Sequence, residues 1–295
     1  MTTIAFVGLG IMGAPMAANL VTARFDVIGL NRSQPAVDRH ISAGGRTAPS
    51  LAEAVAGADV VATMLPDTPD VMSVLTGPDG VFAHARPGTM VLDFSTIRPD
   101  AAAQLAELGA AKSLRFLDAP VSGGEQGAID GTLSIMVGGS SVDFELAQSV
   151  LDAIGTTVVH VGSAGSGQTV KAANQLIVGG TLALVAEALT FLEAHHVNTA
   201  AAVQVLRGGL AGSAVLDRKS GQMLQRSFDP GFRVELHHKD MGIVLDAARS
   251  SGCATPLGTL TGQLLAALVA RGDGALDHTA LFTLIGELSG ARRQV

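Results

Sequence analysis

The chain has 295 residues, 47% of them hydrophobic, and a formal net charge of −7; this length predicts about two folded domains, and the apolar content excludes a disordered chain. No run of basic residues is present that could neutralise consecutive phosphates, which argues against nucleic acid as a partner. The single cysteine, Cys253, excludes an intramolecular disulfide and a zinc site built on several thiolates, and it fits a reducing compartment.

The first half of the chain alternates short β-branched runs with helical patterns. The expected strands are Thr3–Val7, Asp26–Leu30, Asp59–Met64, Thr89–Phe94, Arg115–Asp118 and Thr156–Val161. The expected helices are Gly13–Ala23, Pro35–Ala43, Leu51–Ala56, Pro69–Leu75, Pro99–Leu108 and Val142–Ile154. Ser50 and Glu53 have the spacing of a capping box for one of these helices. The alternation predicts an α/β Rossmann-type domain over residues 1–163, with a mostly parallel, doubly wound sheet.

The N-terminal segment could be mistaken for a signal peptide or a membrane span, because residues 1–23 carry no charged side chain. No positively charged region precedes its apolar run, however, and Gly8, Gly10, Gly13 and Pro15 interrupt that run at the spacing of a loop. We therefore expect a cytoplasmic protein with no membrane partner.

After about residue 163 the β-branched runs become rare and long Ala- and Leu-rich stretches take their place. The expected helices are Ser166–His196, Thr199–Leu206, Val215–Gln225, Leu236–Ser250, Leu257–Ala270 and His278–Ser289. This pattern predicts an all-helical second domain over residues 164–295, joined to the first by the long helix. Gly179 and Gly180 lie inside that helix, where each costs about 1 kcal/mol relative to Ala. Either the helix breaks there, or another backbone packs closely against it.

The first chemical motif is Gly8-Leu9-Gly10-Ile11-Met12-Gly13, which directly follows the first expected strand and opens a helix. Glycines at this spacing permit a tight turn and the close approach of a pyrophosphate, which sits on the amides of the helix N-terminus. A lone motif of this kind is a weak signal. Here the preceding strand, and a second strand that ends near residue 30, supply the context that the motif requires. We expect dinucleotide binding rather than a plain turn.

The second strand ends at Asn31, Arg32 and Ser33, without the carboxylate that would hold the ribose hydroxyls of NAD. Arg32 and Ser33 could instead meet a 2′-phosphate; the alternative is a solvated arginine on a loop. The sequence therefore favours NADP as the cofactor, with NAD as the other possibility. Further candidate cofactor contacts lie at the end of the third strand and directly after it: Met64, Leu65 and Pro66.

Two more strands end in polar or glycine-rich segments at the edge where ligands bind in such sheets. Thr96 could hydrogen-bond the nicotinamide side of the cofactor or the substrate, or else cap the following helix. Ser122, Gly123 and Gly124 expose backbone N–H groups that can converge on one point. Such a nest suits a carboxylate, with a simple glycine-rich turn as the alternative.

Lys171 begins a polar face on the long helix, with Asn174 and Gln175 three and four residues later. Apolar residues surround it, and a lysine is costly to bury there unless it pairs or reacts. The chain has 19 basic residues, of which only four are lysines. Because arginine is the usual cation in this chain, a lysine at this position indicates that a titratable amine is needed there. The alternative is an ordinary lysine at the surface. The chain contains no tyrosine, which excludes dehydrogenases that use a tyrosine as general acid.

Lys239, in the segment Leu236–Asp240, is a second candidate cation for the substrate or the cofactor, against the alternative of a surface pair with Asp240. The adjacent histidines at 195 and 196, and at 237 and 238, suggest a metal site at first sight. Adjacent residues on a helix point about 100° apart, so neither pair is a good chelate and no metal is expected.

Taken together, these motifs resemble the β-hydroxyacid dehydrogenase family over nearly the whole chain. The segments that carry the resemblance are GLGIMGAPMAANL, LDFST, LDAPVSGGEQGAIDGTLSIMVGG, GSGQTVKAANQ and LHHKD. Within this family, Arg207–Lys219, Asp229–Asp240 and Asp277–Leu281 resemble the tartronate semialdehyde reductases most. The departure from the family pattern is Asn31-Arg32, where many members have an aspartate, and it leaves the cofactor preference open.

The resemblance implies a Rossmann domain followed by a helical domain for substrate binding and oligomerisation, in a homodimer or homotetramer. It implies that Lys171 is catalytic, that Ser122, Gly123, Gly124 and Asn174 surround the substrate, and that Thr96 and Lys239 contact the cofactor. The implied reaction is the reversible reduction of 2-hydroxy-3-oxopropanoate to glycerate, with a small carboxylate-bearing aldehyde or alcohol as the partner. The alternatives are a 3-hydroxyisobutyrate dehydrogenase, a glyoxylate or succinic semialdehyde reductase, and an imine reductase on a related fold. A dinucleotide-binding sensor without catalysis is the non-enzyme alternative.

Overall fold

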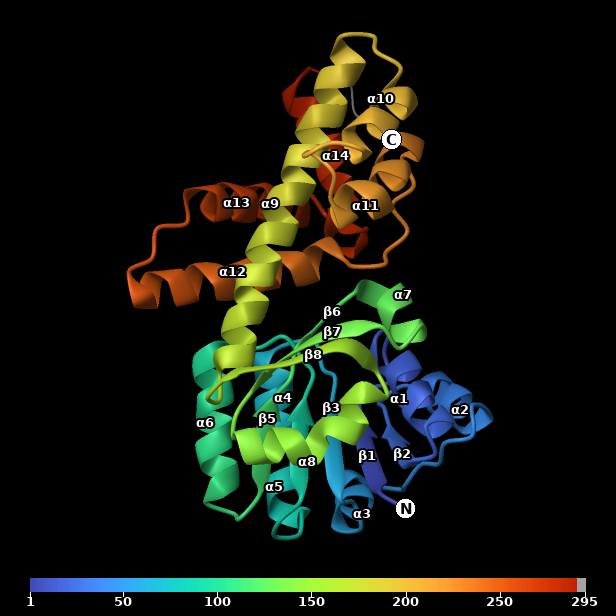
Figure 1. Ribbon diagram of the computed structural model, residues 1–295, viewed down its shortest axis with the longest axis vertical. Coiled ribbons are helices and arrows are strands. Elements are labelled where there is room, and N and C mark those ends of the chain that lie inside the picture. The colour runs from blue at the N-terminus through green and yellow to red at the C-terminus, as the bar shows by residue number, and fades with distance from the viewer. Residues whose placement is uncertain (291–295) are drawn as a thin grey trace. The chain divides into compact units, whose positions relative to one another are not determined.

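The structure is a computed structural model, and it describes residues 1–290. The chain separates into two compact units, Met1–Lys171 and the residues from Ala172 onward. The first unit combines a sheet with helices, and the second is built of helices (Figure 1). The expected architecture, a Rossmann-type α/β unit followed by a helical unit, is confirmed.

The sheet of the first unit has eight strands in the order β2-β1-β3-β4-β5-β7-β6, with β8 paired to β7. The strands are β1 (Thr3–Val7), β2 (Asp26–Leu30), β3 (Val60–Thr63), β4 (Met90–Asp93), β5 (Arg115–Asp118), β6 (Val121–Ser122), β7 (Leu133–Gly138) and β8 (Gly155–Gly162). From β2 to β5 every pairing is parallel, whereas β7 runs antiparallel to β5 and β6. The carboxyl ends of the parallel strands therefore meet at one edge, where ligands bind in such sheets.

Helices cover both faces of this sheet, because successive residues of a strand point to opposite sides. The helices are α1 (Gly13–Thr22), α2 (Gln34–Ser42), α3 (Leu51–Ala56), α4 (Thr68–Thr76), α5 (Val81–His84), α6 (Pro99–Ala110), α7 (Gly124–Ile129) and α8 (Ser141–Asp152). Ile4 and Phe6 of β1 belong to a core with α1 and α8. Ala5, between them, belongs to a second core with α3, α4, α5 and α6. Two cores, one on each face, make the sheet doubly wound.

Most expected elements of the first unit are present, with ends within about two residues of those predicted. The Ser50 hydroxyl accepts a hydrogen bond from the Glu53 N–H at 3.2 Å, as the capping box predicts, and it donates to the Glu53 carboxylate at 3.1 Å. The sequence interpretation missed α5, β6, α7 and β7. The β7 segment is a short apolar run, which periodicity alone cannot assign to a strand or a helix. Its antiparallel pairing makes the sheet mixed at one edge, a feature that the prediction lacked.

The second unit packs helices around an apolar core. They are α9 (Ser166–Ala194), which begins in the first unit, α10 (Thr199–Arg207), α11 (Ala214–Gln225), α12 (Val234–Ser251), α13 (Pro256–Ala270) and α14 (Leu281–Leu288), with short 3-10 turns η1 (Asp273–Ala275) and η2 (His278–Ala280). Leu182 and Leu189 of α9 contribute to this core with Met241 of α12 and Leu265 of α13. Among residues 1–290, α9 is the one helix that is long and apolar enough by composition to cross a membrane, a test that core helices also pass.

The long helix α9 does not break at Gly179 and Gly180. A Cβ on Gly179 would lie 3.1 Å from Nε2 of His237 and 3.3 Å from the sulfur of Met241, both on α12. A side chain at position 179 would therefore crowd side chains of α12, and neither a break in the helix nor a second backbone, the two predicted explanations, accounts for this glycine. Gly180 has open space beside it, so sterics do not require a glycine there.

Candidate active site

The glycine-rich loop between β1 and α1 has the shape that a dinucleotide requires. Gly8 adopts φ +103°, and a Cβ there would overlap the Met64 carbonyl oxygen. A Cβ on Gly13 would overlap the Gly8 carbonyl oxygen, so a larger residue would push the helix away from the loop. Gly10, in contrast, is exposed and faces open space. Gly8 and Gly13 thus permit the tight turn, and Gly10 leaves open space beside it, which fits a pyrophosphate group.

The N-terminus of α1 also fits an anion. Met12 occupies the N-cap position without a side-chain hydrogen bond, and the first turn holds no acidic residue. The Leu9 N–H donates to Oδ1 of Asn31 at 3.2 Å, so the end of β2 holds the loop in place. Arg32 and Ser33 are exposed beside it. Asn31 therefore supports the glycine-rich loop, at a position where a carboxylate would indicate a preference for NAD. Arg32 lies next to it and is exposed to solvent.

Hydrogen bonds tie the loops after β3 and β4 together. The Leu65 N–H donates to the Ser95 hydroxyl at 2.9 Å. Asp93 is fully buried and accepts hydrogen bonds from the Thr63 hydroxyl at 2.8 Å and the Ser95 N–H at 3.1 Å. Burial raises the pKa of Asp93 to about 6, although these hydrogen bonds oppose the rise. Thr96 is half-buried, and the N-cap of α6 is Arg98, so Thr96 does not cap that helix.

Lys171 lies against the segment that leads into the glycine-rich turn after β5. Its side chain is 8% exposed, and Nζ donates to the Val121 carbonyl oxygen at 2.7 Å. Ser122 follows directly, and Gly123 and Gly124 adopt φ +144° and +66°. These angles favour glycine and turn the chain sharply at the start of α7. The first unit therefore brings together a buried amine and the Ser122–Gly124 segment, two features that are about 50 residues apart in the sequence.

A carboxylate and an amide that the sequence interpretation missed hold the start of α9. Asp118, at the end of β5, accepts from the Gly165 N–H at 2.8 Å and the Gln168 N–H at 2.9 Å. The Gln168 side chain donates to the Ser95 carbonyl oxygen at 2.8 Å and accepts from the Ile97 N–H at 3.1 Å. Burial raises the pKa of Asp118. Its place at a strand end was a signal that could have identified it, and these contacts fix the helical turn that carries Lys171.

The polar residues of the second unit form a continuous chain of contacts. Nδ2 of Asn174 donates to Oε1 of Gln175 at 2.8 Å, and Nε2 of Gln175 donates to Oδ2 of Asp240 at 2.6 Å. The other oxygen of Asp240 pairs with the Lys239 ammonium at 2.9 Å. Asp240 is only 3% exposed, so the Lys239–Asp240 pair is not a surface pair. Asp240 was missed because its partner Gln175 is 65 residues away in the sequence.

The paired histidines have separate surroundings. Nδ1 of His195 lies 2.9 Å from the Phe191 carbonyl oxygen, one turn earlier on α9. His237 is buried, and its Nδ1 lies 3.0 Å from Nδ1 of His278 on η2. Within residues 1–290, no three side chains of His, Cys, Asp or Glu are gathered as metal ligands.

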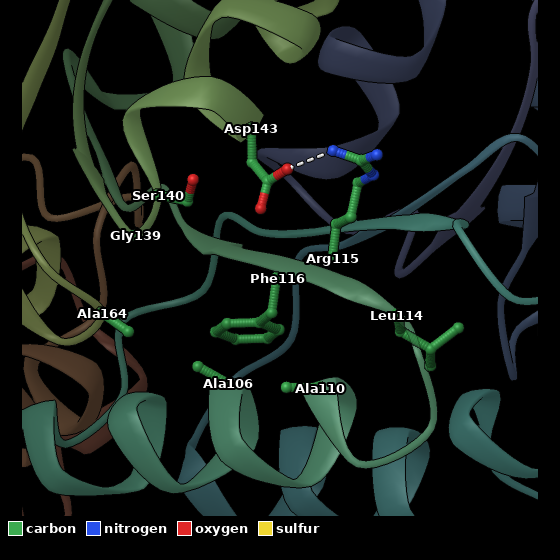
Figure 2. Close-up of a pocket in the computed structure, with 9 residues that line it drawn as sticks. All are labelled: Ala106, Ala110, Leu114, Arg115, Phe116, Gly139, Ser140, Asp143 and Ala164. Atoms are coloured by element: carbon green, nitrogen blue, oxygen red, sulfur yellow. Dashed lines mark hydrogen bonds and ion pairs between the residues drawn. The ribbon is translucent and has the colours of Figure 1, made fainter.

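A small cavity of about 200 Å³ lies elsewhere on the first unit. Its apolar side is formed by Phe116 of β5 and Ala106 and Ala110 of α6, and its polar side by the ion pair of Arg115 with Asp143 at 2.6 Å (Figure 2). None of the site residues predicted from the sequence lines it. The cavity is therefore separate from the candidate active site.

Comparison with known proteins identifies the family. Residues 3–162 match the NAD binding domain of 6-phosphogluconate dehydrogenase, and residues 165–285 match the NAD-binding domain of NADP-dependent 3-hydroxyisobutyrate dehydrogenase. The chain belongs to the β-hydroxyacid dehydrogenase family. It is therefore an NAD(P)-dependent oxidoreductase that acts on hydroxyacids.

Individual relatives of this dehydrogenase have different substrates in their names. The chain is 38% identical to 2-hydroxy-3-oxopropionate reductase of Escherichia coli, over 94% of this chain and 95% of that one. It is 36% identical to NAD-dependent L-serine dehydrogenase of Pseudomonas aeruginosa, over 98% and 100%. The solved structure of Mycobacterium tuberculosis 3-hydroxyisobutyrate dehydrogenase with L-serine matches with a TM-score of 0.86 and 35% identity, over 97% and 99%. The expected family is confirmed, at identities that leave the substrate open.

Proposed function

We propose that this dehydrogenase catalyses the reversible, NADPH-linked reduction of 2-hydroxy-3-oxopropanoate to glycerate, with Lys171 as the proton donor. The observation that carries the proposal is the buried Lys171 amine, 2.7 Å from the carbonyl oxygen of Val121, which directly precedes Ser122, Gly123 and Gly124. An amine held beside a segment that suits a carboxylate is the arrangement that a carboxylate-bearing aldehyde requires.

Lys171 supplies the proton in this reaction. A bound nicotinamide cofactor provides the hydride that is added to the aldehyde carbon. As negative charge develops on the carbonyl oxygen, the Lys171 ammonium stabilises it and donates a proton to form the alcohol. In the oxidation of glycerate, the neutral amine accepts that proton. The Val121 carbonyl keeps Nζ in place by accepting one of its N–H groups.

The Ser122–Gly124 segment binds the substrate carboxylate in this proposal. Gly123 and Gly124 both have positive φ angles, and in this proposal the backbone of the sharp turn that they form binds the carboxylate. Asn174 lies three residues beyond Lys171 on α9 and completes the substrate contacts. A neutral aldehyde of the same size is then a poor substrate.

The proposed cofactor contacts lie in the loops after β1, β2 and β3, together with Thr96 and Lys239, which the family resemblance implies. They comprise Gly8, Leu9, Gly10, Ile11, Met12, Gly13, Asn31, Arg32, Ser33, Met64, Leu65, Pro66, Thr96 and Lys239. NADP is preferred over NAD because Arg32 is exposed at the end of β2 and no carboxylate accompanies it there. A charge-assisted hydrogen bond to the 2′-phosphate contributes about 1.5–3 kcal/mol.

The protein acts as a homodimer or homotetramer in this proposal, in the cytoplasm. Three exposed apolar side chains lie seven residues apart on α9: Ile177 (68% exposed), Leu184 (61%) and Phe191 (62%). Leu257 and Leu260 of α13 are also exposed. Seven-residue spacing places the three α9 side chains on one face of that helix, and apolar faces of this kind pack against another copy in oligomers.

A substrate panel tests the proposed activity. The purified protein is mixed with NADPH and each of tartronate semialdehyde, succinic semialdehyde and glyoxylate, and with NADP⁺ and each of glycerate, L-serine and 3-hydroxyisobutyrate, while absorbance of the reduced cofactor is followed. We expect the highest kcat/KM with tartronate semialdehyde among the aldehydes and with glycerate among the alcohols. Higher efficiency with 3-hydroxyisobutyrate or with succinic semialdehyde would contradict the proposed substrate while leaving the chemistry of Lys171 intact.

A further inference from the structure

Gln168, on the first turn of α9, uses both ends of its side-chain amide in a buried place. The residue is 1% exposed. Its Nε2 donates to the Ser95 carbonyl oxygen at 2.8 Å, and its Oε1 accepts from the Ile97 N–H at 3.1 Å. One amide therefore bonds to the backbone on both sides of Thr96. Its orientation is fixed, because a reversed amide would place an oxygen against a carbonyl oxygen and an N–H against an N–H.

The backbone of the same helical turn is anchored to the sheet. Asp118, at the end of β5, accepts hydrogen bonds from the N–H groups of Gly165 and Gln168. A Cβ on Gly167 would lie 2.4 Å from the Met136 carbonyl oxygen of β7, so this turn lies directly against the backbone of the sheet. The turn is therefore a fixed support, and the Gln168 side chain extends from it to the segment after β4.

The anchored turn also leads to Lys171. Gln168 and Lys171 are three residues apart on a continuous helix, which places their side chains on one face, one turn apart. Both residues are buried, and the Lys171 ammonium donates to the Val121 carbonyl oxygen at 2.7 Å. A single turn of helix thus connects the proposed proton donor to the backbone around Thr96.

The segment that Gln168 holds is continuous with the proposed cofactor contacts. The Ser95 hydroxyl accepts from the Leu65 N–H at 2.9 Å, which ties the loop after β3 to the segment after β4. In the proposed function, Leu65 and Thr96 contact the cofactor and Lys171 protonates the substrate. Gln168 therefore links the cofactor segments to the proton donor, and all of these residues belong to the first unit.

We propose that Gln168 is a positioning residue: its two hydrogen bonds fix the segment around Thr96, and with it the nicotinamide, relative to the Lys171 amine. This inference rests on the proposed roles of Thr96 and Lys171. During reduction, the aldehyde carbon must meet the nicotinamide while the aldehyde oxygen meets Lys171. A displacement of about 1 Å in such a pair of contacts costs about a hundredfold in rate.

Two substitutions remove the hydrogen bonds in different ways. Gln168→Met keeps the length of the side chain and makes neither bond, so it should lower the rate by roughly tenfold to hundredfold at every pH. Gln168→Glu keeps the shape. A protonated carboxyl donates to the Ser95 carbonyl and accepts from the Ile97 N–H, whereas a carboxylate only accepts. Burial and the nearby Asp118 carboxylate raise the pKa of the new carboxyl above its ordinary value of about 4.3, against the charge of Lys171. The rate of this variant relative to the wild type should therefore rise as pH falls from 8 to 5.5.

The quantity measured is the rate constant of a single turnover. Equimolar enzyme and NADPH are mixed with a saturating amount of the aldehyde that the wild type reduces most efficiently, and oxidation of the bound cofactor is followed. Misfolded protein lowers the amplitude of this first turnover but not its rate constant. We expect full amplitude, a lower rate constant in Gln168→Met, and a Kd for NADPH within about threefold of the wild type. A lower amplitude with an unchanged rate constant would show a merely structural role and overturn the inference.

A double-mutant comparison tests whether Gln168 acts through Lys171. In a Lys171→Ala background the substrate has to meet the nicotinamide alone, so adding Gln168→Met should lower the rate constant by less than about threefold. Gln104→Glu, at an exposed glutamine of α6, is the control and should leave the rate constant unchanged at both pH values. Equal losses from Gln168→Met in both backgrounds would overturn the inference alone. Unimpaired turnover in Lys171→Ala by itself would refute the proposed role of Lys171, and with it the inference.

Discussion

Buried polar side chains are used differently in the two units. In the first unit they bond mainly to the backbone, as Asp118 does to two N–H groups and Gln168 to an N–H and a carbonyl. In the second unit several bond to one another, as in the chain through Gln175 and Asp240 and in the contact of His237 with His278. Hydrogen bonds to the backbone fix the path of loops. A hydrogen bond between two side chains, in contrast, can be altered by substituting a residue without moving the backbone. We infer that the first unit carries the proton donor, Lys171, and the glycine-rich cofactor loop.

The largest effect is expected for Lys171→Ala, which should lower turnover by roughly 10²–10⁴, the usual contribution of general acid–base catalysis. If Lys171 is the proton donor, the loss is similar for every substrate that the wild type accepts. Cofactor affinity should be preserved, because the glycine-rich loop is unchanged. Lys112→Ala, at an exposed lysine of the same unit, is the control. Turnover within threefold of the wild type would remove Lys171 from the role of proton donor.

Gly13→Ala tests the cofactor loop. The new Cβ would overlap the Gly8 carbonyl oxygen, so the loop must open and NADPH affinity should fall about tenfold to hundredfold. Gly242→Ala is the control, because nothing lies within 4 Å of a Cβ at that position of α12. Fluorescence titration with NADPH measures both. Equal affinity in the two variants would show that the loop tolerates a side chain and that the steric argument is wrong.

Arg32→Ala should change the choice of cofactor without changing the choice of substrate. Loss of a charge-assisted bond to the 2′-phosphate should reduce the ratio of kcat/KM for NADPH over NADH by roughly tenfold to hundredfold. Arg39→Ala, at an exposed position of α2, serves as the control. A wild-type preference for NADH, or the same ratio in the variant, would show that Arg32 does not bind the phosphate.

Asp93→Asn tests the cost of a carboxylate buried at a strand end of the first unit. Because its pKa is raised to about 6, folded Asp93 retains a proton that the unfolded chain releases above about pH 4. The folded state therefore loses stability as pH rises from about 4 to 6. Relative to the wild type, the variant should gain on the order of 2 kcal/mol between pH 4.5 and pH 8. Chemical denaturation at both pH values measures this difference, and a pH-independent difference would mean that Asp93 stays ionised throughout.

The histidine contact of the second unit should give the opposite pH dependence. Burial, followed by the proximity of His237, holds the pKa of His278 well below its ordinary value, so the folded state keeps this ring neutral. The unfolded chain binds a proton below about pH 6.5, and stability is lost as pH falls further. His278→Gln should remove part of this acid sensitivity, as measured by thermal unfolding of variant and wild type from pH 7.5 to 5. If the variant loses as much thermal stability at low pH as the wild type, other groups cause the acid sensitivity.

Local signals explain what the sequence could predict. β1, β2 and β5 have the predicted ends because turn residues bound each β-branched or apolar run. The glycine-rich motif and the polar face of α9 were likewise visible within a few residues of sequence. The contacts that complete the site were not, because Val121 meets Lys171, and Gln175 meets Asp240, only after segments of 50 and 65 residues have folded. No periodic pattern in the sequence indicates which residues form such long-range contacts.

The central claim, that the protein transfers hydride to a carboxylate-bearing aldehyde, is tested most directly by an isotope. The enzyme is incubated with tartronate semialdehyde and NADPH that carries deuterium at carbon 4 of the nicotinamide, with each of the two stereoisomers in turn. We predict that the glycerate formed gains one deuterium on C3 from one stereoisomer and none from the other, as mass spectrometry will show. Glycerate without deuterium from either isomer, or oxidation of NADPH without formation of glycerate, would contradict the account.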